Sequence, residues 1–172
     1  MIINDVEILE RCRTSSLINP FVSSKIQVMG KRRIPSFGLS DHGYDLRFSG
    51  EGKVFVKQDK RWQGINNDYI IIRPRQHALL STMEILNMPK DLVGTLFTKS
   101  TWARKGLIFS LAAVDAGWRG SLTIATHNPT SEQVKIYKGV GLVQIRFHKV
   151  TPAATSYEGS YQDTKEATVA PF

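Results

Sequence analysis

Short apolar runs separated by turn residues recur between residues 43 and 147, and they limit the folds open to this chain. Each run is rich in Val, Ile, Leu, Phe or Tyr, and Gly, Pro, Asn or Asp stands between them, as in all-β domains. The runs cover residues 44–48, 53–56, 69–72, 78–82, 92–97, 107–109, 122–124, 134–136 and 142–147. Many short strands at close intervals favour closed or double-sheet architectures. We therefore predict an all-β fold, a distorted jelly roll or β-barrel.

Helical structure is expected at only two places. Asn4 and Asp5 precede residues spaced for one apolar helical face, and Pro20 disfavours helix just before it. A second helix, a turn or two long, is expected over residues 101–105. Residues 58–68 are polar and contain Gly and Asn, so we expect a loop there.

A length of 172 residues fits one domain. We divide it into a β-barrel domain over residues 1–150 and a C-terminal arm over residues 151–172, where Ser, Thr, Ala, Gly and Tyr dominate. Such an arm is expected to be disordered or to order over a ligand or a neighbouring subunit. The single cysteine, Cys12, excludes an internal disulfide and a Cys-rich metal site. No apolar run approaches the roughly 20 residues that span a bilayer, so we predict a cytoplasmic protein with no membrane partner.

The net charge of +8 favours a polyanionic partner, either nucleic acid or a small molecule drawn into a cleft. The cations are dispersed along the sequence, and it contains no continuous basic helix, zinc finger or aromatic-basic strand signature. We therefore favour a small phosphate-bearing ligand over nucleic acid.

Two neighbouring motifs carry the residue types of a nucleotide site. The first, residues 99–104 (KSTWAR), places a cation, hydroxyls and a guanidinium close together, which suits the oxygens of a polyphosphate. The second, residues 115–120 (DAGWRG), places the carboxylate of Asp115 before a Gly-flanked turn that carries Trp118. A carboxylate can activate water, and an indole offers a flat wall to a sugar or base.

Each of these residues also has a structural interpretation. Ser100 can cap the short helix, and Arg104 can be a surface cation. Asp115 can close an Asx-turn, while Trp118 can pack in a core between subunits.

Six segments, taken in order, resemble the dUTPase and dCTP deaminase superfamily, and most closely the archaeal-type dUTPases built on a dCTP-deaminase-like frame. They are residues 17–21, 42–47, 99–104, 114–120, 139–144 and 157–162. The resemblance covers nearly the whole chain. It implies the β-clip type of barrel found in that superfamily and a homotrimer with active sites between subunits. It also implies Mg²⁺-assisted attack of water on the α-phosphorus of dUTP, which gives dUMP and pyrophosphate.

The resemblance also assigns roles to individual residues. Asp115 would orient the attacking water and the deoxyribose 3′-hydroxyl, as the catalytic group. The substrate-binding residues would be Lys99, Ser100, Thr101, Arg104, Ala113, Trp118, Gln144, Tyr161 and Gln162. Tyr161 and Gln162 belong to the arm, which would fold over the triphosphate. Asp163 departs from glycine-richer relatives, and it would repel phosphate if it pointed inward.

No residue is expected to bind Mg²⁺ directly, because the triphosphate and water would hold most of it. Asp45 would have a structural role or would contact a metal-bound water, and pairing with Arg47 is an equal alternative. The four histidines show no spacing typical of metal ligands.

One position distinguishes the two activities of the superfamily. In dCTP deaminases, the resemblance implies a glutamate ten residues after the motif aspartate, where it shuttles protons at C4 of cytosine. This chain has Ala125 there, and a methyl group cannot transfer protons. We therefore predict a dUTP diphosphatase. A dCTP deaminase or a bifunctional enzyme is the alternative, and a non-catalytic nucleotide- or nucleic-acid-binding protein is a third possibility.

Overall fold

The computed structural model describes residues 1–152, 155 and 157–170. In chain order its elements are α1 (Asp5–Ser15), β1 (Ile18–Asn19), β2 (Ile26–Met29), β3 (Arg32–Ser40), β4 (Gly43–Val56), β5 (Arg61–Asn66), β6 (Tyr69–Ile72), β7 (His77–Asn87), β8 (Leu92–Thr98), α2 (Ser100–Arg104), β9 (Ile108–Ser110), β10 (Ala113–Val114), β11 (Arg119–His127), β12 (Val134–Tyr137) and β13 (Gly141–Lys149). The predicted all-β fold class, with a short N-terminal helix, is confirmed.

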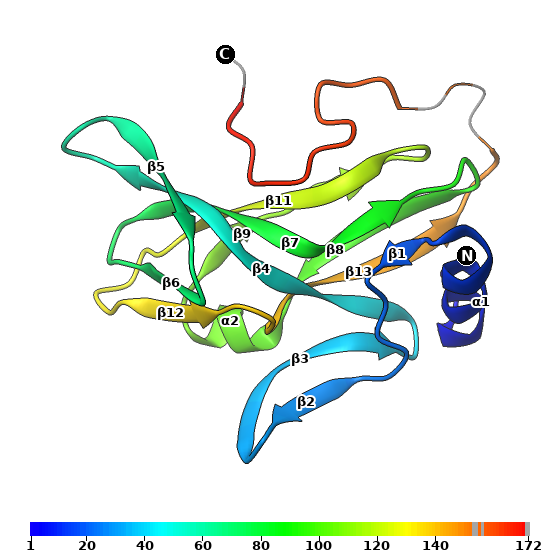
Figure 1. Cartoon of the computed structure of the whole chain (residues 1–172), viewed down its shortest axis with the longest axis horizontal. Helices are drawn as coiled ribbons and strands as arrows, with labels where there is room; N and C mark the ends of the chain where they lie inside the picture. Colours follow the sequence, from blue (N-terminus) through cyan, green and yellow to red (C-terminus); the bar gives the residue numbers. More distant parts are fainter. Residues whose placement is uncertain (153–154, 156, 171–172) are drawn as a thin grey trace.

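Within the described residues, eleven strands form one curled antiparallel sheet whose main path is β10-β8-β13-β4-β7-β11-β9 (Figure 1). The short β1 pairs with β7, the β2–β3 hairpin attaches to β4, and β5 extends from the other end of β4. A separate two-stranded sheet is formed by β6 and β12. The eleven-stranded sheet curls around one side of the core. The small β6–β12 sheet and α2 lie near one end of the large sheet (Figure 1).

β4 is longer than the sequence pattern indicated. We expected two strands on either side of the Gly-Glu-Gly segment at residues 50–52, but β4 continues through it. Gly50 has a φ of +93°, which a glycine adopts without strain, and the register against β7 shifts between Phe48 and Gly52. The glycine segment is therefore an irregularity within one strand and not a turn.

The prediction of a loop over residues 58–68 is wrong, because β5 lies there and pairs with β4. The pairing runs from Val56 opposite Arg61 to Glu51 opposite Asn66. A second hairpin, β2–β3, projects from the sheet where no strand was assigned (Figure 1). Most β2 and β5 residues are exposed or half-buried. Strands with little buried surface lack the apolar alternation from which strands are predicted.

The predicted N-terminal helix is confirmed as α1. The Asn4 side chain accepts a hydrogen bond from the backbone N–H of Glu7 (3.1 Å), and Ser16 ends the helix in a left-handed conformation. Arg11 donates to Glu7 (3.0 Å) and to Asp91 (2.8 Å), the residue before β8. The hydrogen bond from Arg11 holds the pKa of the Asp91 carboxyl below its ordinary value and links α1 to the residue before β8.

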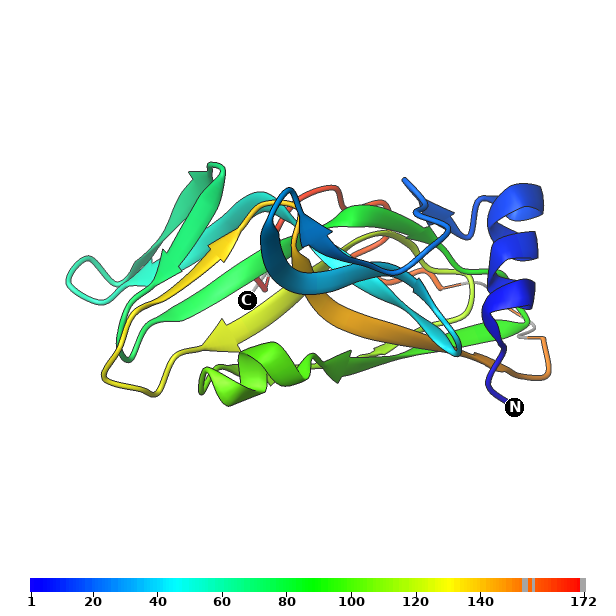
Figure 2. The same ribbon diagram turned by 90° about the horizontal axis from the view of Figure 1, so that it is seen from below.

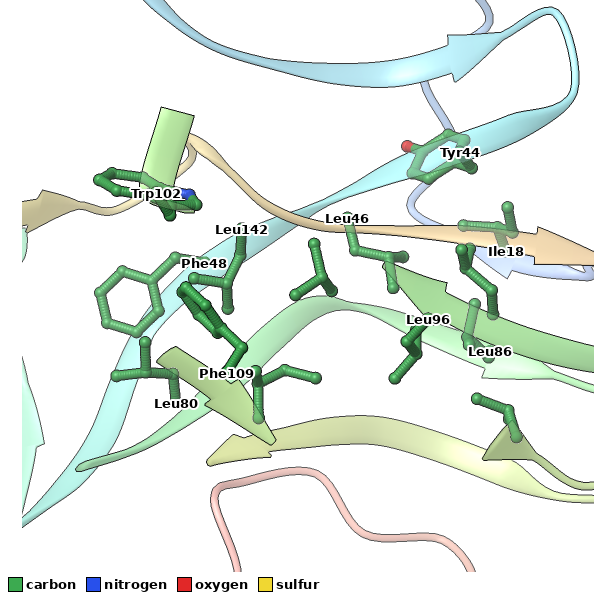
Figure 3. Packing of buried hydrophobic residues seen from close by; sticks show 14 of the residues in the cluster. Ile18, Tyr44, Leu46, Phe48, Leu80, Leu86, Leu96, Trp102, Phe109 and Leu142 are labelled. Carbon is green, nitrogen blue, oxygen red and sulfur yellow. The ribbon is translucent and has the colours of Figure 1, made fainter. Parts of the chain in front are cut away.

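The buried apolar residues that the structure describes form one cluster against the curled sheet (Figure 3). Trp102 closes one end of it from α2, is 3% exposed, and donates from Nε1 to the Gly141 carbonyl (2.9 Å). Because Trp102 faces inward, the side chains of Ser100 and Arg104 on this short helix face solvent. The core thus fixes the orientation of the KSTWAR motif.

Gly141 marks a close approach between β13 and β3. A Cβ atom added there would lie 1.7 Å from the carbonyl oxygen of Ser36. We expect Gly141→Ala to lower the free energy of unfolding by about 1–3 kcal/mol, because a strand must move to admit the methyl group. Denaturant titration followed by tryptophan fluorescence measures this. Gly64→Ala is the matched control, since nothing lies within 4 Å of the corresponding position, and equal losses in both variants would contradict the prediction.

The described part of the arm lies along β11 of its own chain (Figure 1). The backbone N–H of Ser121 donates to the Thr164 carbonyl (2.8 Å), and that of Thr168 donates to the Thr123 hydroxyl (3.0 Å). Ala167 is 2% exposed. In the part of the chain that the structure describes, no helix is long and apolar enough to cross a membrane.

Candidate active site

Three of the predicted site residues, Lys99, Asp45 and Gln144, meet in one buried cluster. The Asp45 carboxylate accepts hydrogen bonds from Lys99 Nζ (2.5 Å) and Ser36 Oγ (2.9 Å) at one oxygen, and from Gln144 Nε2 (3.2 Å) at the other. Burial lowers the pKa of Lys99, and the hydrogen bond to Asp45 opposes this shift. The cluster joins β3, β4 and β13 to the start of α2, so it positions the KSTWAR motif.

This cluster corrects two expectations for Asp45. Its carboxylate pairs with Lys99, whereas Arg47 pairs with Glu84 (2.6 Å). Both oxygens of Asp45 are bonded to protein donors and the residue is 0% exposed, which does not fit contact with a metal-bound water. The side chain of Lys99 is 10% exposed, so its ammonium group is directed at Asp45 and not at the surface.

The remaining residues of the first motif lie on α2 (Figure 2). Ser100 and Arg104 are both exposed, and their spacing of four places them on one side of the helix. Thr101 and Lys105 line a neighbouring cavity of about 890 Å³ that the β2–β3 hairpin and β12 also border. A hydroxyl and a guanidinium on one exposed face can bind phosphate oxygens that approach from outside the subunit.

The second motif lines a different cavity. Ala113, Asp115, Trp118 and Tyr161 all contribute to a space of about 600 Å³, between the sheet and the C-terminal arm. This volume lies in the range of small-molecule sites. Asp115 is exposed, and Trp118 is 7% exposed. The cavity thus combines a carboxylate with a flat apolar wall.

Hydrogen bonds between the arm and residues 117–119 hold the turn that carries Trp118. The indole Nε1 of Trp118 donates to the Tyr161 carbonyl (3.1 Å). The Gln162 amide bridges the turn, since its Oε1 accepts from the backbone N–H of Arg119 (3.0 Å) and its Nε2 donates to the Gly117 carbonyl (3.1 Å). The arm therefore contacts the turn of its own chain through both of its predicted site residues.

Asp163 follows these residues and is directed at Arg119. Its carboxylate accepts a hydrogen bond from Arg119 Nε (2.5 Å), and both side chains are exposed. Arg119 lowers the pKa of the Asp163 carboxyl through this hydrogen bond. The carboxylate is thus matched with a cation and is not directed into the cavity.

His77 also lines the cavity of Asp115, and the sequence analysis did not assign it to the site. It lies opposite His127, with ring centroids 6.5 Å apart, and the edge of Trp62 contacts it at 5.4 Å between centroids. Burial and the neighbouring His127 lower the pKa of His77. Fifty residues separate the two histidines in sequence, so only the pairing of β7 with β11 brings them together.

Among the described residues of one chain, the two motifs line two different cavities. Ser100 and Arg104 lie on the outer face of α2, whereas Asp115 and Trp118 lie under the arm, and different cavities adjoin them.

A family model described as dCTP deaminase-like matches residues 2–150. The chain belongs to this family. The predicted membership of the dUTPase and dCTP deaminase superfamily is thereby confirmed.

Curated relatives agree with the family assignment over almost the full length. The dCTP deaminase of Pseudomonas fluorescens (strain SBW25) is 31% identical over 181 residues, which covers 96% of this chain and 96% of the relative. The dCTP deaminase of Orientia tsutsugamushi (strain Boryong) is 34% identical over 173 residues, which covers 93% of this chain and 92% of the relative.

Solved structures show the same fold at lower identity. The 2′-deoxycytidine 5′-triphosphate deaminase of Agrobacterium tumefaciens matches 87% of this chain with a TM-score of 0.62 and 17% identity, and the match spans 48% of that chain. A Staphylococcus bacteriophage 80alpha dUTPase matches 78% of this chain and 94% of its own, with a TM-score of 0.50 and 20% identity.

These relatives overturn the prediction of a dUTP diphosphatase. That prediction depended on Ala125 and on the resemblance to archaeal-type dUTPases. The relatives named dCTP deaminase match this chain over nearly its whole length, and the family model is dCTP deaminase-like. The bacteriophage dUTPase shares the fold of this chain at 20% sequence identity. A dCTP deaminase is therefore the better supported activity, with Ala125 at the position where the resemblance implies a glutamate.

The described residues offer no cluster of side chains typical of a metal site. In that part of the chain, no group of three or more His, Cys, Asp or Glu side chains could hold a metal ion.

Proposed function

We propose that this protein is a dCTP deaminase that converts dCTP and water to dUTP and ammonia, in a homotrimer with sites between subunits. The relatives named dCTP deaminase support the reaction. The proposed site is based on the cavity that Asp115 and Trp118 line. Ser100 and Arg104 lie on α2 and do not line that cavity. One subunit would bind the deoxycytidine, and the exposed face of α2 from a neighbour would bind the phosphates.

The residues have distinct roles in this proposal. Trp118 packs against the deoxyribose, and Asp115 accepts a hydrogen bond from the 3′-hydroxyl. Ala113 borders the base through its backbone, since its side chain carries no polar group. Tyr161 and Gln162 keep the arm over the nucleoside. Mg²⁺, carried by the triphosphate and water, would neutralise phosphate charge, and no step for the protein depends on it.

The alanine at position 125 favours a second candidate function, in which the protein binds dCTP without converting it. Ala125 lies on β11, and its methyl group cannot accept or return a proton. Binding needs only the cavity, the indole and the cations, all of which this chain retains.

Product analysis separates these candidates. The purified protein is incubated with dCTP and Mg²⁺, ammonia is measured, and the nucleotides are resolved by chromatography. We expect equal amounts of dUTP and ammonia from dCTP. Binding of dCTP, followed by tryptophan fluorescence, without any ammonia would reject the deaminase and leave the binding protein.

A further inference from the structure

Ala125 shares one face of the sheet with two histidines. In the antiparallel pairing of β7 and β11, Ala125 lies opposite Leu79, and His127 lies opposite His77. Directly opposed residues in such a pair project to the same face, and so do residues two positions apart on one strand. Among the residues of β7 and β11, His77 and His127 are thus the titratable groups nearest in register to the position where the family resemblance implies a glutamate.

His77 is also placed to meet a ligand. Together with Leu79 it lines the cavity that contains Asp115 and Trp118. Trp62 packs edge-on against its ring at 5.4 Å between centroids, which limits how the imidazole can turn. Asp115 lines the same cavity but lies in the turn before β11 and not on the paired part of β7 and β11.

We propose that His77 transfers the protons of the deamination, in place of the glutamate that Ala125 replaces. This inference rests on the proposed function. The oxygen of water forms a bond to C4 of cytosine while the C4–N3 π pair moves to N3. One water proton passes through the His77 imidazole to N3. The second passes from the new C4 hydroxyl through His77 to the amino group, the C4–N bond breaks, and ammonia leaves a C4 carbonyl.

A neutral imidazole is suited to this relay because it accepts a proton at one nitrogen and returns it at the same atom. Burial and the nearby His127 lower the pKa of His77, which favours the neutral form of its ring. His127 lies beside His77 on the paired strand and needs no contact with the base.

The test measures ammonia release from dCTP by the wild type and by His77→Gln, with tryptophan fluorescence to follow dCTP binding. We expect His77→Gln to lower kcat by at least about 10²-fold while dCTP affinity changes little. His42→Gln is the matched control, since His42 is exposed and borders a different cavity, and it should retain full activity. Introducing Ala125→Glu into His77→Gln should raise kcat by at least about tenfold, because a carboxylate returns to the strand position.

The outcomes separate this inference from the proposed function. An active wild type with an equally active His77→Gln variant overturns the role of His77 and leaves the deaminase assignment standing. A wild type that binds dCTP but releases no ammonia overturns both. A His77→Gln variant that loses dCTP binding together with activity assigns His77 to substrate binding and overturns the relay.

Discussion

Replacing Glu84 by glutamine is expected to lower the free energy of unfolding by about 3–5 kcal/mol. The Glu84 carboxylate is 0% exposed and accepts hydrogen bonds from the backbone N–H (2.7 Å) and Nε (2.6 Å) of Arg47. Burial raises the pKa of Glu84, and the hydrogen bonds from Arg47 oppose that shift. Glutamine keeps the size of the side chain but leaves the guanidinium without a counter-charge in the interior.

The surroundings of Arg47 explain the size of this effect. Among the described residues its Nη2 already has no hydrogen-bond partner, and its guanidinium lies 5.2 Å from the centroid of the Phe37 ring. Among the described residues, Glu84 is the acidic partner with which this guanidinium forms an ion pair. Denaturant unfolding followed by tryptophan fluorescence measures the difference.

Two controls make this prediction specific. Asp59→Asn removes the partner of Arg61 in an exposed ion pair and should cost less than about 1 kcal/mol. Replacing both buried partners, as Arg47→Met with Glu84→Leu, should recover most of the stability, because no charge then remains unpaired. A Glu84→Gln variant as stable as Asp59→Asn would show that the buried pair contributes little.

Replacing Asp115 by asparagine is expected to lower kcat/KM for dCTP deamination by about 10²-fold. In the proposed site, the Asp115 carboxylate accepts a hydrogen bond from the deoxyribose 3′-hydroxyl. Hydrogen bonds to a charged group contribute about 1.5–3 kcal/mol, which corresponds to roughly 10- to 150-fold in kcat/KM. Asparagine keeps the shape of the side chain but removes the charge, so the loss reports on electrostatics and not on packing.

A substrate analogue shows whether this hydrogen bond exists. With 2′,3′-dideoxy-CTP, which lacks the 3′-hydroxyl, the wild type should be impaired, whereas Asp115→Asn should treat the two substrates alike. Asp59→Asn, on the turn between β4 and β5, serves as the charge-matched control and should behave as the wild type. Equal discrimination between the two substrates by wild type and Asp115→Asn would remove Asp115 from the sugar site.

The α-helices could be predicted because their signals are local. Asn4 caps α1 through a contact three residues away, and the segment that forms α2 carries no strand pattern. Most strands of the core sheet were also predictable, since their apolar residues face one interior. β5 was missed because it is a largely exposed extension of β4, in which pairing and not burial maintains the strand.

The candidate site was predictable only as separate pieces. The side chains of the motif at positions 99–104 indicated phosphate contacts, and those of the motif at positions 115–120 indicated contacts with a sugar or base. Pairing between distant strands decided that Lys99 faces Asp45 and that Arg47 faces Glu84. The same kind of long-range pairing placed His77 in the cavity of Asp115.

The sequence by itself determined the family, the all-β class and the residue types available for nucleotide chemistry, because motifs and apolar patterns are local properties of a chain. Tertiary structure decided which ionic partners meet, that the arm lies on β11 of its own subunit, and that the two motifs lie apart within one chain. These features depend on strand register and on the curl of the sheet. Both follow from the packing of residues far apart in sequence, which no local pattern records.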